Sequence, residues 1–390
     1  MRLSHCRRDD LKLGGKRIIH VIFGLPFLLV VTRFVWPLHL PLTAKILVTA
    51  LVFFASQYHL WSRLSSGSVF SPEFPRWAVI LFNWAFGAIL FLAALQLLLD
   101  VTVLLARLAY GGRVHAPDSV RYALAALAAA VAAIGVYQAI RIPPTKNIDV
   151  VIRGLPQRFD GYTILQLTDL HISRLFPASW ARAVVERANG LGVDLIAITG
   201  DLIDGTLAVR RADVEPLRGL SAADGVYVIP GNHEYYFGYR TWMDCYSAMG
   251  MHLLENKHVV LDRNGEQLIL AGVTDHASRA AGHPAPNLAL ALKGAPRGIP
   301  VILLDHQPRD ARSAAALGVA LQLSGHTHGG MVVGIDRLTA RANAGFVSGR
   351  YEVGGMTLYV NNGTALWPGF ALRLGRPSEL TRITLRRAGD

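Results

Sequence analysis

Five short polar motifs in the second half of this 390-residue chain each follow a short run of apolar residues. In order they are Asp169-Leu170-His171, Gly200-Asp201, Gly231-Asn232-His233-Glu234, Asp305-His306 and Gly325-His326-Thr327-His328. Short apolar runs bounded by turn residues are typical of buried strands. Because ligands bind beyond the carboxyl ends of strands in open α/β sheets, we expect these polar side chains to meet at one edge of a sheet.

The apolar pattern around the motifs predicts an α/β domain. Strands are expected at residues 163–168, 195–199, 226–229, 300–304, 320–323, 357–360 and 381–385, and helices at 179–191, 241–249 and 308–316. The pair Asn264-Gly265 lies between apolar runs at 259–262 and 267–273, which is typical of a type I′ hairpin turn.

The first 142 residues have a different composition, dominated by Leu, Ala, Val, Phe and Trp, and they predict an α-helical transmembrane domain. Apolar segments that approach the roughly 20 residues of a membrane-spanning helix lie at 18–36, 42–61, 77–99 and 121–140. The first two have marginal lengths and could instead form a re-entrant or interfacial hairpin. Pro143-Pro144 ends the last helix, so we expect a linker at 143–150 and the catalytic domain at 151–390.

The chain is strongly basic, with a net charge of +12 and a sequence pI near 10.0. In a soluble protein this charge would make nucleic-acid binding a candidate function. In a membrane protein, Lys and Arg gather in cytoplasmic loops and contact anionic headgroups. We therefore expect the bilayer as a partner and no specific nucleic acid.

The distribution of Lys and Arg predicts the sidedness. These residues are most frequent before the first apolar segment and after the fourth, which favours a cytoplasmic N-terminus in the inner (plasma) membrane. An even number of crossings in this multi-pass arrangement places the catalytic domain in the cytoplasm too. If one segment does not span, the catalytic domain lies on the opposite side of the membrane. A competing signal is Arg7-Arg8, which loosely resembles a twin-arginine export signal, although Asp10 stands where that signal prefers an apolar residue.

The residue types of the five motifs suit a hydrolytic metal centre. Carboxylates, an amide oxygen and neutral imidazoles are ligands for Mn²⁺, Fe or Zn²⁺, and not for Ca²⁺. With only Cys6 and Cys245 in the chain, a cysteine-rich zinc site is excluded. Two metals about 3.5–4 Å apart can share a bridging carboxylate and a bridging hydroxide that attacks phosphorus.

The ordered set resembles the calcineurin-like metallophosphoesterase superfamily, whose pattern is D-x-H, G-D, G-N-H-[DE], H and G-H-x-H. The resemblance covers roughly residues 145–390. It implies a four-layer αββα sandwich, preceded here by the helical membrane domain, and two divalent metal ions (Mn, Fe or Zn). One metal would be held by Asp169, His171, Asp201 and His328. The other would share Asp201 and add Asn232, His306 and His326.

The same resemblance implies the catalytic residues. His233 is similar to the family's catalytic histidine, which contacts the phosphate and protonates or stabilises the leaving oxygen. Asp204 lies where some members place a carboxylate that orients this histidine. The run Gly200–Thr206 lacks the Arg of the Ser/Thr protein phosphatase motif G-D-x-x-D-R-G, and Leu321–Gly330 looks more like the small bacterial phosphodiesterase-type branch.

The function expected from the sequence is a membrane-anchored hydrolase of phosphomonoesters or phosphodiesters, with a lipid-linked or nucleotide-linked substrate. One alternative is a catalytically silent membrane sensor or scaffold that retains the metal site, against which the intact His233 argues. Another is a transporter with a regulatory domain. Against it, no apolar segment carries the cluster of ionisable groups that a transport pathway needs. The oligomeric state is left open.

Overall fold

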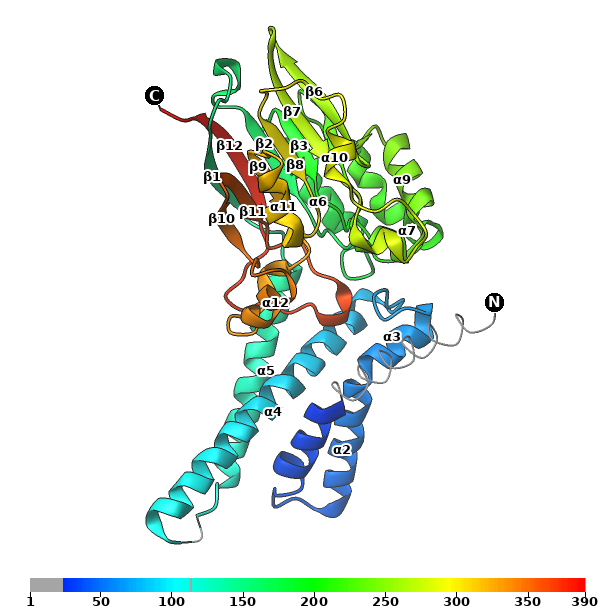
Figure 1. Ribbon diagram of the computed structural model, residues 1–390. Coiled ribbons are helices and arrows are strands. Elements are labelled where there is room, and N and C mark those ends of the chain that lie inside the picture. Colours follow the sequence, from blue (N-terminus) through cyan, green and yellow to red (C-terminus); the bar gives the residue numbers. More distant parts are fainter. Residues whose placement is uncertain (1–23, 113, 390) are drawn as a thin grey trace, which may run out of the picture. The chain divides into compact units, whose positions relative to one another are not determined.

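The structure, a computed structural model, describes residues 24–112 and 114–389. The chain divides into two compact units, residues 1–137 and 138–390, each with its own core (Figure 1). The first unit is entirely helical in the part that the structure describes. The second contains two β-sheets with helices around them.

The helical unit contains the apolar segments expected from the sequence, with different bounds. A helix over Gly24–Val35 ends in the π-helical turn η1 (Val31–Val35), and the start of the expected first segment, 18–23, lies outside the described residues. It is followed by α2 (Leu42–Ser56), α3 (Tyr58–Ser66), α4 (Arg76–Tyr110) and α5 (Asp118–Ile140).

Only α4 and α5, among the described helices, are long and apolar enough to cross a membrane by length and composition. The segment expected as one helix at 42–61 is divided at Gln57 into α2 and α3. The division has a physical reason, since α3 is rich in polar side chains such as Ser62 and Arg63 and cannot continue an apolar span.

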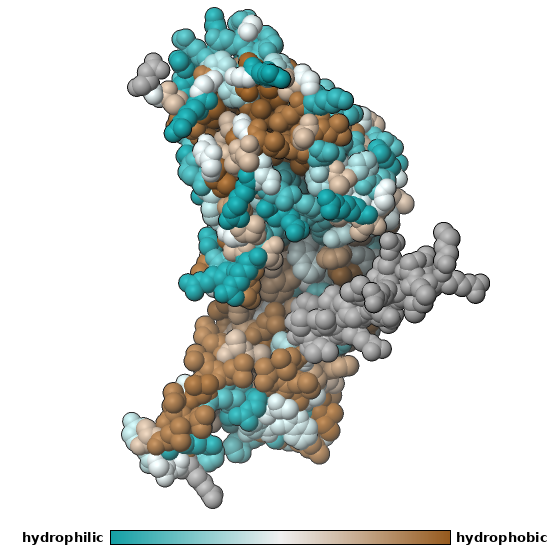
Figure 2. Space-filling view, viewed as in Figure 1, coloured by the Kyte–Doolittle hydropathy of each residue, from teal (hydrophilic) through white to brown (hydrophobic). Residues whose placement is uncertain are grey.

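Much of the surface of this unit is hydrophobic (Figure 2). Large side chains such as Leu47, Leu51 and Leu98 are more than half exposed, whereas the unit's core holds Val35 and Ile89. A soluble monomer rarely exposes so large a continuous apolar area. Such a surface is typical of a contact with a membrane or with another protein.

The second unit contains a sheet of strand order β1-β12-β2-β3-β4-β5 and a sheet of order β10-β11-β9-β8-β7-β6. The first is built from β1 (Thr145–Ile152), β2 (Thr163–Leu167), β3 (Leu195–Ile198), β4 (Val226–Val228), β5 (His252–Leu253) and β12 (Leu380–Arg387). The second is built from β6 (Lys257–Arg263), β7 (Glu266–Gly272), β8 (Val301–Leu304), β9 (Leu321–Ser324), β10 (Gly349–Val353) and β11 (Met356–Val360).

The two sheets pack face to face, because alternate residues of each strand point into a shared core. Ile164 and Ile383 of the first sheet meet Leu270 and Leu323 of the second there. The other face of the second sheet packs on α10 (Leu288–Ala291) and α11 (Ala311–Ala316). The remaining helices are α6 (Ala178–Asn189), α7 (Leu207–Val214), α8 (Asn232–Tyr236), α9 (Tyr239–Ala248) and α12 (Asp336–Ala342).

This architecture confirms the predicted fold class, a layered α/β sandwich that follows apolar helices (Figure 1). The predicted hairpin is also present, since Asn264 (φ 54°) and Gly265 (φ 83°) form the turn between β6 and β7. One expectation needs correction. The linker expected at 143–150 is shorter, because Thr145 already begins β1, which pairs in parallel with β12. As an edge strand with exposed polar residues, β1 lacks the continuous apolar run that marks the buried strands.

Candidate metal centre

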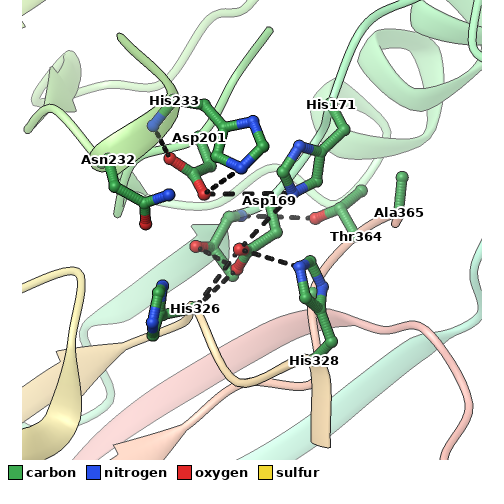
Figure 3. A network of polar contacts seen from close by, with 12 residues as sticks. Asp169, His171, Asp201, Asn232, His233, His326, His328, Thr364 and Ala365 are labelled. Carbon is green, nitrogen blue, oxygen red and sulfur yellow. Dashed lines mark hydrogen bonds and ion pairs between the residues drawn. The ribbon is translucent and has the colours of Figure 1, made fainter. Parts of the chain in front are cut away.

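The five motifs lie at strand ends and converge on one site (Figure 3). Asp169 follows β2, Asp201 follows β3, Asn232 and His233 open the short helix α8 after β4, His306 follows β8, and His326 and His328 follow β9. Three overlapping groups in which the ligand atoms lie within 4.8 Å of one another are Asp169–His171–His328, His171–Asp201–His233 and Asp201–His306–His326. All seven residues predicted as ligands are thus brought together, with Asn232 joining through His306.

One side of the site is formed by Asp169, His171 and His328. The Nε2 atoms of His171 and His328 lie 3.8 Å and 3.7 Å from Asp169 Oδ1. His171 Nε2 also lies 4.0 Å from Asp201 Oδ2, so His171 lies between Asp169 and the second aspartate of the site. These spacings leave room for an ion between the donor atoms, because they exceed hydrogen-bond lengths.

The other side is formed around Asp201, as the resemblance implies for a shared ligand. His306 Nε2 lies 3.2 Å from Asp201 Oδ2 and 3.1 Å from Asn232 Oδ1. The opposite ring atom, His306 Nδ1, lies 2.7 Å from the carbonyl oxygen of Thr199, which fixes the ring so that Nε2 faces the carboxylate.

His233 faces the same space from α8. Its Nδ1 contacts Asp204 Oδ1, and its Nε2 lies 3.9 Å from Asp201 Oδ2. Burial alone would lower the pKa of His233, but the Asp201 and Asp204 carboxylates raise it. The predicted role of Asp204 as the carboxylate beside His233 agrees with this placement, and Asp204 Oδ2 also lies 3.1 Å from Nδ1 of His171.

The backbone at the site is strained. Nine non-glycine residues of the described chain have a positive φ, and five of them are predicted metal ligands: Asp169 (53°), His171 (44°), Asp201 (56°), His326 (69°) and His328 (51°). A left-handed backbone costs a residue with a Cβ roughly 1–2 kcal/mol. Strain of this kind gathers at functional sites, where the surrounding structure holds it in place.

Two motif glycines allow the backbone to approach the carboxylates. A Cβ on Gly231 would clash with Asp201, and a Cβ on Gly325 would clash with Thr168 and Asp169. The glycines of G-N-H-E and G-H-x-H are therefore needed for close packing around the two aspartates.

Glu234, the last residue of the third motif, holds the Asp201 loop. Its carboxylate is fully buried and accepts hydrogen bonds from the backbone N–H groups of Gly231, Asp201 and Leu202 at 2.7–3.0 Å. The Tyr246 hydroxyl donates a fourth bond at 3.1 Å. Glu234 thus fixes the segments that carry Asp201 and His233 relative to each other.

Sequence reasoning missed the support on the opposite side. The guanidinium of Arg373 is buried and donates to the carbonyl oxygens of His328, Asn362 and Ala365 at 2.5–3.0 Å. The Thr364 and Ala365 N–H groups in turn donate to the carbonyls of Thr168 and Asp169. An arginine that bonds only to main-chain oxygens has no motif, so the one available signal was its isolation among apolar residues.

The donor set fits divalent cations. His171 Nε2 is buried and has no hydrogen-bond partner among the described residues, so this atom is available to an ion once it is deprotonated. Burial lowers the pKa of His326 to about 4 and that of His328 to about 3, so both rings are neutral at physiological pH, as ligands must be. The ligand roles of individual residues remain predictions.

Comparison with known proteins places the chain in a family. Residues 162–330 match the family model of the calcineurin-like phosphoesterases. A Danio rerio protein named "Transmembrane protein with metallophosphoesterase domain" is 31% identical over 67% of this chain and 62% of its own length. A Helicobacter pylori metallophosphoesterase is 32% identical over 64% of this chain and 66% of its own length. Bacillus subtilis YkuE, a metallophosphoesterase, is 31% identical over 60% of this chain and 82% of its own length.

The chain belongs to the calcineurin-like phosphoesterase family, a class of hydrolases that act on phosphoester bonds. The family assignment confirms the resemblance read from the motifs and implies divalent metals at the clustered histidines and aspartates. The chain spans less than two thirds of the length of the Danio rerio and Helicobacter pylori relatives. The name of the former, shared by a Bos taurus relative, suggests membrane association for a chain with two long apolar helices.

Proposed function

We propose that the protein is a membrane-anchored, two-metal phosphoesterase. The observation that carries this proposal is the convergence of all seven predicted ligands around Asp201, with His233 facing the same space. One metal would be held by Asp169, His171, Asp201 and His328, and the other by Asp201, Asn232, His306 and His326. Manganese, iron and zinc are the metals that suit these donors.

When bound, the metals would supply Lewis acidity that lowers the pKa of a water molecule and neutralises charge on the phosphoryl oxygens. The protein's own contribution on the leaving-group side comes from His233. Asp204 holds its Nδ1, so the proton on Nε2 points toward the site. The Asp201 and Asp204 carboxylates raise the pKa of His233, which favours the protonated ring that a proton donor to the departing oxygen needs.

The anchoring rests on α4 and α5 and on the exposed apolar surface of the helical unit. We propose a multi-pass protein of the inner (plasma) membrane with a cytoplasmic catalytic domain. This sidedness requires an even number of membrane crossings. The shorter helices Gly24–Val35 and Leu42–Ser56 must therefore either both cross the membrane or both form a hairpin that does not cross it. Protease accessibility of the catalytic domain in sealed, right-side-out vesicles tests it, because a cytoplasmic domain stays protected.

A lipid-linked phosphoester is the finer proposal for the substrate. Thr145 begins β1 beside Leu380 of β12, and β12 runs antiparallel to β2, so the chain enters this unit at the edge where β2 ends in Asp169. Only Arg141–Pro144 separate α5 from β1, which limits the distance from the helix end to Thr145 to about 18 Å. A site on this edge stays within reach of a bilayer that α5 leaves.

The direct test uses full-length protein loaded with Mn²⁺ and bis-p-nitrophenyl phosphate as a generic diester. Asp201→Asn removes the shared carboxylate and should lower the rate by at least about 100-fold. Asp244→Asn, an exposed aspartate on α9, is the matched control and should leave the rate unchanged. Metal-loaded protein that is inert toward both phosphomonoesters and phosphodiesters would contradict the proposal.

A further inference from the structure

Seven ionisable side chains of the helical unit line one cavity of about 590 Å³. They are Arg33, His39, Asp100, Arg107, His115, Asp118 and Arg121. The sequence distributes them over the end of η1, the turn before α2, the second half of α4, and the turn and first residues of α5. They form a cluster only after the helices pack, which is why no apolar segment predicted one.

Each arginine of the cavity is anchored through a single nitrogen. Arg33 Nε donates to Asp100 Oδ2 at 2.8 Å, and Arg107 Nε donates to the carbonyl oxygen of Val114 at 2.8 Å. Arg121 Nη1 donates to the carbonyl oxygen of Arg33 at 2.5 Å and to Gln96 Oε1 at 3.3 Å. Over residues 24–112 and 114–389, the other nitrogens of the three guanidinium groups make no hydrogen bond.

The two carboxylates are engaged by donors of the protein. Asp100 Oδ1 accepts from Gln96 Nε2 at 3.0 Å while Oδ2 accepts from Arg33. Asp118 Oδ2 lies 2.9 Å from both the backbone N and the ring Nδ1 of His39. The Arg33 side chain is 54% exposed but Asp100 only 21%, so the guanidinium and not the carboxylate faces outward. Three arginines against two aspartates leave the lining with a charge of +1 when the histidines are neutral.

We propose that this cavity binds the phosphate group of an anionic ligand. A guanidinium held by one nitrogen keeps a free edge of N–H donors that matches two phosphate oxygens. The remaining wall favours a lipid headgroup as the source of the phosphate, because the exposed apolar side chains Leu97, Val101 and Leu104 line the same cavity and can contact an acyl chain. Figure 2 shows hydrophilic residues that interrupt the hydrophobic surface of this unit.

The cavity is separate from the metal centre. Asp118 and Arg121 lie in the first turn of α5, whereas the catalytic unit begins at Gln138 near its other end. These 17 positions, from Arg121 to Gln138, correspond to about 26 Å along a helix. None of the residues that line the cavity belongs to the groups of the metal centre. The site binds phosphate and does not take part in hydrolysis.

Native mass spectrometry of the full-length protein in detergent tests the proposal with three probes: phosphatidylglycerol, phosphatidylcholine and inorganic phosphate. We expect phosphatidylglycerol to bind about tenfold more tightly than phosphatidylcholine, because phosphatidylglycerol lacks the choline cation that neutralises the phosphate charge. Arg107→Gln and Arg121→Gln should each weaken phosphatidylglycerol binding about tenfold, the loss of one charge-assisted pair. Arg63→Gln, the same change on α3 outside the cavity, is the matched control.

Arg107→Gln also guards against misfolding, because Arg107 bonds only a carbonyl and its loss leaves no carboxylate unpaired. Binding of inorganic phosphate that weakens in the same variants would support the phosphate site and identify a soluble phosphate compound as its ligand. Equal affinity for the two lipids, or unchanged binding in both cavity variants, would overturn the proposal. The measurement involves no turnover, so its result is independent of the proposed phosphoesterase activity.

Discussion

Asp204 lies between His233 and His171, with one carboxylate oxygen against Nδ1 of His233 and the other 3.1 Å from Nδ1 of His171. The proposed proton donor and a proposed metal ligand are therefore oriented by the same buried group. Orienting carboxylates of this kind fix the tautomer and direction of a histidine ring. Asp204 therefore links the position of the proposed acid to that of the proposed metal ligand.

Replacing His233 by Ala removes the proposed proton donor but leaves the ligand set intact. Hydrolysis of a diester with an alkoxide leaving group should fall about 10²–10⁴-fold, whereas a p-nitrophenolate ester should lose much less because that group departs without a proton. Rates on the two esters measure the difference, and the metal content of the variant, determined by atomic emission, should equal that of the wild type. Equal losses on both esters would argue against a proton-donating role.

Asp204→Asn should have a broader effect than His233→Ala. An amide has one acceptor oxygen, so it cannot orient both rings, and metal affinity should fall about 10–100-fold together with kcat. The comparison is made by metal titration of each apoprotein, with Asp244→Asn as the exposed control. Normal metal affinity in Asp204→Asn would show that His171 does not depend on this carboxylate.

Glu234→Gln tests the support of the Asp201 loop. The glutamine replaces one carboxylate oxygen by an NH₂ group that faces backbone donors, so the free energy of unfolding should fall by about 1–3 kcal/mol. Thermal unfolding of the metal-free protein measures the change without interference from metal binding. Glu186→Gln, an exposed position of α6, supplies the control, and an equal unfolding temperature for both variants would contradict the structural role of Glu234.

Metal binding should strengthen as the pH rises. Burial alone would lower the pKa of His171, but Asp204, Asp169 and Asp201 raise it to about 10, and Asp201 raises the pKa of His306. Both rings are therefore protonated at neutral pH in the metal-free protein and must lose a proton to bind a metal. His326 and His328, whose pKa values burial lowers, release none.

Calorimetric titration with Mn²⁺ in two buffers of different ionisation enthalpy measures this release. Between pH 6 and 8 we expect up to about two protons per chain and a matching gain in affinity. Affinity that stays constant over this interval, with no proton release, would show that these rings are already neutral.

The sequence was sufficient to predict the strands that carry the motifs, because each strand is a run of apolar residues followed directly by polar ones. It also predicted the Asn264-Gly265 turn, where a local pair of residues determines the conformation. The positive φ of five ligand residues was not predictable, because Asp and His are enriched in the left-handed region but only a small share of them adopt it. That conformation is imposed by neighbouring segments.

Long-range support also escaped the sequence. Arg373 bonds to main-chain oxygens of His328 and Asn362, contacts that depend on the fold and leave no trace in spacing. Arg33 and Asp100 are 67 positions apart, and each is a single charge near the end of an apolar segment until helix packing joins them. The edge strand β1 was assigned in part to the linker, because its exposed polar residues hide the pairing with β12.

In the proposed mechanism, two metals act together at a site bridged by Asp201. The most direct test of this mechanism is the activity of the apoprotein toward bis-p-nitrophenyl phosphate as Mn²⁺ is added in known ratio to the chain. The proposed ligand set predicts that activity rises to saturation at two Mn²⁺ per chain. Saturation at a single equivalent, or activity that does not depend on added metal, would contradict it.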